Sequence, residues 1–158
     1  GMVAPELDFP GVDGKNIKVS SLRGKVVLID FWAAWCKPCR AENQNVVRAY
    51  NKYKSKGFEV FSVSLDGLDD RTKARFSTEE QIQQQMDRSK DRWKQAIAAD
   101  GLTWPGHVSD LKKWNSAPAQ TYGVSGIPRT FMIDRDGKIA AIGLRGADAI
   151  ETELLKLL

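Results

Sequence analysis

The sequence is poor in residues that bind metals or build disulfide networks, since its 158 residues include two cysteines and one histidine. A structural zinc site needs four protein ligands, so these residues cannot complete one within a single chain. The cysteines, Cys36 and Cys39, are three positions apart. A cross-link over so short a loop gains little loop-closure entropy, so a structural disulfide is poorly motivated. A chemical role for the pair is therefore favoured.

The chain also lacks long apolar runs and dense basic clusters. No stretch approaches the ~20 apolar residues that a membrane-spanning helix needs. The net charge is +4 and the basic residues are scattered, which argues against a nucleic-acid partner. A hydrophobic content of 42% and a charged content of 28% are ordinary for a globular protein. We expect one monomeric domain over residues 1–158.

The two cysteines stand where a strand meets a helix. An apolar run over residues 26–32 precedes them, and a helix-compatible stretch begins at Arg40. A Cys-x-x-Cys pair in this context is typical of redox motifs. A thiol at a helix N-terminus is exposed to the positive end of the macrodipole and to free N–H groups, which favour its thiolate. Because the thiolate is the form that attacks disulfides, the spacing predicts thiol–disulfide chemistry.

The hydrophobic pattern predicts an α/β fold. Strands are expected at residues 26–32, 58–65, 130–134 and 139–144, and helices at 38–55, 78–100 and 147–158. The first strand is almost wholly apolar, as expected for a central strand buried on both faces. Residues 1–25 form an extended lead-in with a turn at Asp13-Gly14. The sum is a three-layer sandwich, a mixed central sheet flanked by helices.

Two segments are predicted to be mainly loops. Residues 66–77 are polar and mixed in charge, which indicates a solvated loop, and residues 102–120 indicate a loop-rich stretch with a short helical piece. His107 falls in the second segment and is interpreted as a loop residue rather than a catalytic base. The helix between these segments carries an apolar stripe, interpreted as core packing. The stripe consists of Ile82, Met86, Trp93 and Ile97.

Two motifs resemble those of a known family. Residues 30–39 resemble the active-site segment of thioredoxin-fold proteins, and residues 126–131 resemble the segment that carries their cis-proline. More narrowly, residues 36–42, 123–128 and 131–139 are similar to the TlpA/ResA-like branch, which is related to AhpC/TSA proteins. The resemblance covers nearly the whole chain. One departure is the segment from about 67 to 90, which looks longer than usual and is interpreted as a helical insertion before the cis-proline half.

The resemblance implies a thioredoxin-like sandwich and a bacterial thiol–disulfide oxidoreductase. Such a protein uses no cofactor beyond the redox-active Cys36–Cys39 disulfide and binds no metal. Its implied partners are protein disulfide substrates, expected to be disulfides of exported proteins, and an upstream thiol reductant. The branch is periplasmic or otherwise extracytoplasmic, and Gly1-Met2 looks like a cloning remnant. We therefore expect an export signal or membrane anchor to precede these residues in the natural chain.

Four residues are expected to carry the chemistry. Cys36 should be the exposed nucleophile and Cys39 the more buried thiol that resolves the mixed disulfide. Asp30 can accept the Cys39 proton if burial raises its pKa toward neutrality; the alternative is a solvated Asp at a strand end. Glu42 shares a helix face with Cys39 and, by resemblance, tunes the cysteines. Its alternative is an ordinary first-turn carboxylate interacting with the helix dipole.

A second set of residues is expected to contact the substrate. The set consists of Trp35, Lys37, Pro38, Ile127, Pro128 and Arg129. A cis Pro128 would place the Ile127 backbone beside the cysteines, where an extended substrate can pair with it. Arg129 adds a positive charge that favours acidic partners, unless it is simply a solvated side chain. Trp32 would join Trp35 and Ile127 in an apolar rim, or lie in the core instead.

Two other functions remain open at this point. A peroxiredoxin-like peroxidase shares the fold, but its reactive cysteine follows a Thr or Ser by three residues, where this chain has Ala33 before Cys36. A non-catalytic binding module would use the same groove with idle cysteines. Replacement of Cys36 by Ser distinguishes an enzyme from the binding module, because an enzyme would lose disulfide reduction whereas a binding module would keep its partner.

The residues between the cysteines, Lys37-Pro38, resemble those of reductants more than those of strong oxidants. We therefore expect a redox titration of the Cys36–Cys39 couple to give a midpoint potential well below the ~−120 mV of strong oxidants. A midpoint close to that of the strong oxidants would contradict the assignment as a reductase.

Overall fold

The computed structural model describes residues 1–158, and its elements alternate between strands and helices. The strands are β1 (Asp8–Pro10), β2 (Asn16–Lys18), β3 (Val26–Trp32), β4 (Phe58–Ser64), β5 (Gly106–Val108), β6 (Arg129–Ile133) and β7 (Ile139–Ile142). The α-helices are α1 (Lys37–Tyr53), α2 (Asp70–Lys73), α3 (Glu79–Asp100), α4 (Ala117–Thr121) and α5 (Ala147–Leu157). Short 3-10 segments are η1 (Val19–Leu22), η2 (Lys54–Lys56) and η3 (Lys113–Asn115).

Five strands form one mixed sheet in the order β5-β4-β3-β6-β7. Strands β3, β4 and β5 run parallel, whereas β6 is antiparallel to β3 and β7 is antiparallel to β6. The predicted parallel pair and C-terminal hairpin are therefore confirmed. In the lead-in, β1 and β2 form a separate antiparallel hairpin around the predicted turn.

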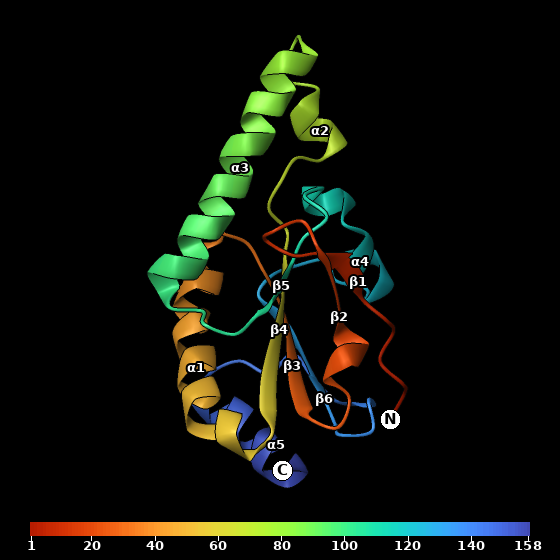
Figure 1. The fold of residues 1–158 in the computed structure, drawn as a ribbon, viewed down its shortest axis with the longest axis vertical. Coiled ribbons are helices and arrows are strands. Elements are labelled where there is room, and N and C mark those ends of the chain that lie inside the picture. The colour runs from red at the N-terminus through yellow and green to blue at the C-terminus, as the bar shows by residue number, and fades with distance from the viewer.

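Helices cover both faces of the sheet. Helices α1, α3 and α5 lie on one side, and α4 lies on the other side with the β1–β2 hairpin (Figure 1). Every residue of β3 is buried because both faces of this central strand are covered. The predicted three-layer α/β sandwich is confirmed. No helix combines the length and the apolar character that a membrane crossing requires.

The carboxyl end of β3 leads the chain into α1 at the cysteine pair. Cys36 is the N-cap of α1, and Pro38 lies in the first turn, where its missing N–H leaves no intrahelical bond unmade. The helix passes into η2, which ends at Gly57 in the left-handed conformation with φ of 98°. Residues 36–57 thus form the crossover that returns the chain to β4, parallel to β3.

The prediction of a solvated loop over residues 66–77 is wrong for the buried residues 66–68 and for the short helix α2, whereas residues 69–77 are partly or fully exposed as predicted. Asp66 and Leu68 are buried, and the segment contains α2, whose N-cap is Asp69. Asp66 lies two residues after the end of β4, and its carboxylate accepts hydrogen bonds from the Ala34 N–H and the Ser64 hydroxyl. The polar composition of the segment could not reveal this burial, because the Ala34 N–H that Asp66 binds is 32 residues away in the chain.

The prediction that His107 lies in a loop is also wrong. His107 is buried in β5, opposite Ser62 of β4. Its Nε2–H donates to the Leu102 carbonyl oxygen at 3.0 Å, and its ring stacks on Trp104. Burial lowers the pKa of His107 to about 4, so the imidazole is neutral at pH 7. The strand was missed because three residues are too few to show a period of two.

The apolar stripe on α3 packs into the core only in its C-terminal half. Trp93 is buried in the core and Ile97 packs against it, as predicted. Ile82 and Met86 lie outside the core, because the N-terminal half of α3 projects beyond the sheet alongside α2 (Figure 1). The interpretation of the stripe as core packing is therefore wrong for these two residues. The insertion over about 67–90 and the single domain stay predictions.

Removal of a buried side chain from the central strand should destabilise the fold strongly. We expect Ile29→Ala, with the disulfide intact, to lower the free energy of unfolding by about 2–5 kcal/mol in urea titrations, because it leaves a cavity in β3. Ile142→Ala, at an exposed position in edge strand β7, is the matched control and should cost below about 1 kcal/mol. Equal losses for the two variants would contradict the central position of β3.

Candidate active site

The two cysteines are joined by a disulfide at the N-terminus of α1. Their Cα atoms are 5.2 Å apart, and the Cys39 N–H donates to Cys36 Sγ at 3.3 Å. Cys36 is 5% exposed and Cys39 is 1% exposed. Cys36 is thus the more accessible of the two, but the expectation of an exposed Cys36 is wrong for this oxidised form. The Ile127 carbonyl oxygen lies 3.9 Å from its Sγ and contributes to this burial.

The second motif lies beside the disulfide, as predicted. The Ile127–Pro128 peptide bond is cis. Both residues are half-buried, and with the preceding glycines they line a hollow of about 440 Å³ that ends at Arg129. Arg129 is exposed at the first position of β6. An extended chain lying in this hollow would have access to both the Ile127 backbone and Cys36.

The remaining residues expected to contact substrate divide into two groups. Trp35, Lys37 and Pro38 are exposed around the cysteines, and Trp35 retains 48% of its surface. Trp32 is completely buried at the end of β3, so its expected place in the rim is wrong. The two tryptophans differ in exposure because Trp32 is the last residue of the buried strand β3, whereas Trp35 lies in the loop after it.

Asp30 is buried in the middle of the central strand. Its register neighbours are Ser62 on β4 and Thr130 on β6, and its Oδ2 has no hydrogen-bond partner. Burial, followed by the negative charge of Glu42, raises the pKa of Asp30 to about 7. The alternative of a solvated Asp is therefore wrong. A carboxyl group with this pKa can gain or lose a proton near neutral pH.

Glu42 connects α1 to the N-terminus of α5. Its Oε1 accepts a hydrogen bond from the Gly146 N–H at 2.6 Å, and its Oε2 accepts one from Asn45 Nδ2 at 3.0 Å. Gly146 is the N-cap of α5, where a negative charge is stabilised by the helix dipole. The alternative of a first-turn carboxylate on its own helix is wrong, since Glu42 lies beyond that turn. Its negative charge instead contributes to the raised pKa of Asp30.

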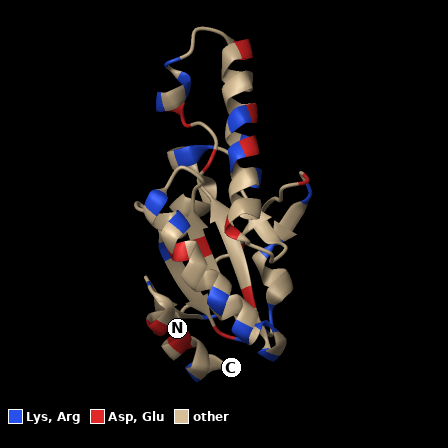
Figure 2. Ribbon diagram, turned by 90° about the vertical axis from the view of Figure 1, so that its left-hand side faces the viewer, with Lys and Arg blue, Asp and Glu red and all other residues tan.

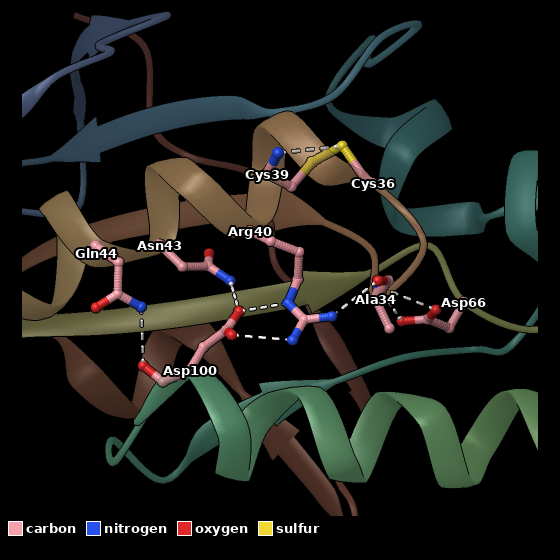
Figure 3. A network of polar contacts seen from close by, with 8 residues as sticks. All are labelled: Ala34, Cys36, Cys39, Arg40, Asn43, Gln44, Asp66 and Asp100. Atoms are coloured by element: carbon pink, nitrogen blue, oxygen red, sulfur yellow. Dashed lines mark hydrogen bonds and ion pairs between the residues drawn. A yellow bond between two sulfur atoms is a disulfide. The ribbon is translucent and has the colours of Figure 1, made fainter.

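A polar network that the sequence did not reveal holds the segment before Cys36 (Figure 3). The Ala34 N–H donates to both carboxylate oxygens of Asp66 at 3.1 Å. The Ala34 carbonyl oxygen accepts a hydrogen bond from Arg40 Nη1 at 3.1 Å. Both polar groups of one residue are therefore held by side chains, which fixes the path of the chain into the cysteine pair.

The same network joins α1 to the end of α3 (Figure 3). Arg40 forms a two-pronged ion pair with Asp100, through Nε at 2.6 Å and Nη2 at 3.0 Å. Asn43 Nδ2 also donates to this carboxylate, at 3.0 Å. Burial raises the pKa of Asp66, although the Ser64 hydroxyl, the Ala34 N–H and Arg40 act in the opposite direction. The only sequence signal for this network was a carboxylate directly after a buried strand.

The residues around the disulfide form no metal centre. No group of three or more His, Cys, Asp or Glu side chains in residues 1–158 is arranged to hold a metal ion. The Cys36–Cys39 pair can itself exchange two electrons between its dithiol and disulfide forms.

Comparison with known proteins places this geometry in a family. The chain matches the AhpC/TSA family over residues 1–142. It is 30% identical to the thiol-disulfide oxidoreductase ResA of Bacillus thuringiensis (strain Al Hakam), covering 99% of this chain and 78% of that protein. It is 27% identical to ResA of Bacillus subtilis (strain 168), covering 90% of this chain and 65% of that one.

Solved structures share the fold over almost the whole chain. The C-terminal domain of a putative thiol-disulfide oxidoreductase from Bacteroides thetaiotaomicron superposes with a TM-score of 0.78 at 30% identity, covering 99% of this chain and 94% of that one. A putative thiol:disulfide interchange protein DsbE from Chlorobium tepidum gives a TM-score of 0.72 at 30% identity, with coverage of 99% and 96%. The expected thioredoxin-like fold is confirmed.

The raised pKa of Asp30 should make the stability depend on pH. The folded protein binds this proton more tightly than the unfolded chain, whose carboxyl has a pKa of 3.8. The Asp30 contribution to stability is therefore complete below pH ~4 and is lost as the pH rises to ~7, a change of about 4 kcal/mol. Asp30→Asn removes this loss. We expect the unfolding free energy of the variant, relative to wild type, to rise by about this amount between pH 4 and 8 in urea titrations.

Asp136→Asn, at an exposed position in the turn between β6 and β7, is the matched control. Its unfolding free energy should follow that of wild type at every pH. If the difference between Asp30→Asn and wild type stayed constant from pH 4 to 8, the raised pKa would be excluded.

Proposed function

The chain belongs to the AhpC/TSA family, and from this premise we propose that it reduces disulfides of exported proteins through the Cys36–Cys39 pair. It is a thiol–disulfide oxidoreductase of thioredoxin-like fold. The observation that carries the proposal is the position of the Cys36–Cys39 disulfide, at the N-terminus of α1 and beside the cis Ile127–Pro128 bond.

The reaction is a pair of thiol–disulfide exchanges. The Cys36 thiolate attacks one sulfur of the substrate disulfide, which forms a mixed disulfide and releases the other substrate sulfur as a thiolate. The Cys39 thiolate then attacks Cys36 Sγ, which forms the Cys36–Cys39 disulfide and releases the second substrate thiol. Two electrons pass to the substrate, and an upstream thiol reductant restores the dithiol. The N-terminus of α1 and the Cys39 N–H stabilise the attacking thiolate.

Asp30 accepts the proton that Cys39 loses when it attacks. With a pKa of about 7, the carboxylate is a stronger base than an ordinary Asp and is still available near neutral pH. Glu42 supports this role, because its charge contributes to the raised pKa of Asp30 and is itself held by the Gly146 N–H. The two carboxylates thus differ in function. Asp30 exchanges the proton, and the charge of Glu42 raises the affinity of Asp30 for that proton.

The substrate lies across the disulfide between two motifs. An extended segment pairs with the Ile127 backbone in the hollow lined by Pro128 and Arg129. Trp35 and the exposed residues Lys37 and Pro38, at the start of α1, bound the other side. The protein acts as a monomer outside the cytoplasm, a location supported by the resemblance of residues 36–42 to an exported branch.

Replacement of the attacking cysteine should abolish activity. We expect Cys36→Ser to lower insulin-disulfide reduction to the uncatalysed rate, because no thiolate remains at the N-terminus of α1. Turbidity of reduced insulin measures the loss, and circular dichroism verifies that the variant is folded. Undiminished reduction by this variant would exclude Cys36 as the attacking thiol. A folded wild-type protein that reduces no insulin would instead favour the binding role, and fast peroxide consumption would favour the peroxidase role.

Replacement of the resolving cysteine should trap the substrate. We expect Cys39→Ser to accumulate mixed disulfides between Cys36 and its partners, since the second exchange cannot occur. Non-reducing electrophoresis detects these adducts, and mass spectrometry identifies the partner proteins. The double variant Cys36→Ser/Cys39→Ser is the control and should form none. Absence of adducts in Cys39→Ser itself would contradict attack by Cys36.

A further inference from the structure

A hollow of about 590 Å³ adjoins the active site beyond Trp35. Its lining combines the two tryptophans Trp35 and Trp114 with the cations Arg71, Arg75 and Lys113. Trp35 directly precedes Cys36, so a substrate bound at the disulfide passes close to this hollow. We propose that the hollow binds an acidic, extended segment of the protein whose disulfide reacts at Cys36. The inference rests on the proposed function and specifies the class of its substrate.

The two tryptophans form an exposed aromatic wall. Trp35 is 48% exposed and Trp114 is 39% exposed, with ring centroids 6.4 Å apart. The Trp35 Nε1–H donates to the Leu65 carbonyl oxygen at 3.4 Å, which fixes the ring. Exposed, adjacent aromatic rings are common anchors for a partner chain, because they offer apolar area with little loss of conformational freedom.

The hollow is preformed because the two loops that frame it are bonded to each other. The Leu68 N–H donates to the Leu111 carbonyl oxygen at 3.1 Å, and the Lys113 N–H donates to the Asp66 carbonyl oxygen at 3.2 Å. Gly67 has a φ of 99°, and a Cβ atom there would lie 2.0 Å from the Leu111 carbonyl oxygen. Only glycine permits this approach. A binding surface held in place in advance loses less entropy when a partner docks.

Lys113 is held in an unusual conformation that directs its ammonium group into the hollow. Its φ of 51° lies in the left-handed region, which residues other than glycine rarely adopt and which persists only when the surroundings impose it. Lys113 Nζ donates to Thr72 Oγ1 at 3.3 Å and lies 5.9 Å from the centre of the Trp35 ring. The cation is therefore fixed between α2 and the aromatic wall.

The charge of the hollow is positive. Its carboxylate, Asp69, is the N-cap of α2, where its Oδ1 accepts hydrogen bonds from the Thr72 N–H at 2.8 Å and from the Thr72 hydroxyl at 2.7 Å. Arg71 and Arg75 are exposed and form no ion pair. Figure 2 shows basic residues along much of α2, beside the projecting half of α3. Three cations thus face one carboxylate that already has partners.

The opposite side of Trp35 adds one unpaired cation. A second hollow of about 330 Å³ there is lined in part by Arg92, which is exposed and forms no ion pair, whereas its other cation, Arg40, is paired with Asp100. Arg129 adds a further cation at the hollow beside Pro128. Because cations without an ion pair lie on more than one side of the disulfide, acidic residues near the reacting cysteine of a substrate complement this face best.

The test compares two peptides that differ only in charge. Both contain the same disulfide, flanked in one by glutamates and in the other by glutamines at the same positions. We expect the reduced protein to reduce the acidic peptide with a kcat/KM about tenfold higher at low ionic strength, and the ratio to fall toward one as salt is added. The double variant Arg71→Gln/Arg75→Gln should lower the ratio to about two.

The matched control is Lys25→Gln/Lys54→Gln, which removes the same charge from exposed positions at the far end of the sheet and should keep the tenfold ratio. Each ratio compares two peptides on one protein sample, so a partly unfolded variant does not distort it. Equal rates for the two peptides, or an equal fall of the ratio in both double variants, would overturn the acidic docking surface alone. Failure of the wild-type protein to reduce either peptide would overturn the proposed function itself.

Discussion

The burial of β3 on both faces is the constraint on which the active site depends. The strand carries Asp30 into an apolar layer, where water cannot stabilise its charge and its pKa rises to about 7. The same strand leads the chain to Cys36, so the proposed proton acceptor and the thiol pair are fixed by one rigid element. A site built at the end of a covered strand keeps its geometry with little help from the exposed loops.

Around this strand, side-chain to backbone hydrogen bonds fix the chain at the points where function needs precision. Asp66 and Arg40 hold the two polar groups of Ala34, just before the cysteine pair. Glu42 holds the Gly146 N–H at the start of α5 and places a charge that acts on Asp30. The Arg40–Asp100 ion pair ties α1 to α3, and the Glu42–Gly146 hydrogen bond ties α1 to α5. The electrostatics of the site is therefore coupled to the packing of its helices.

The segment between β4 and β5 supplies what the central sheet does not. It adds α2 and the projecting half of α3, which contribute little to the core but frame a basic and aromatic face beside Trp35 (Figure 1). Ile82 and Met86 show the consequence, since their helical spacing is regular although no core lies beneath them. A stretch of chain that is released from packing the sheet is available to determine which substrates reach the cysteines.

The sequence by itself determined the features that depend on neighbours in the chain. Spacing and local pattern located the cysteine pair at a strand–helix junction, the buried β3 and the parallel return to β4, and the resemblance located the cis Pro128. The tertiary structure alone decided the burial of Asp66, the strand that contains His107, and the partner of Glu42 at Gly146. Periodicity and capping act within a few residues, whereas burial and hydrogen bonding of these groups depend on residues far away in the chain. Their environment, and with it the pKa of Asp30, exists only once the helices have closed over the sheet.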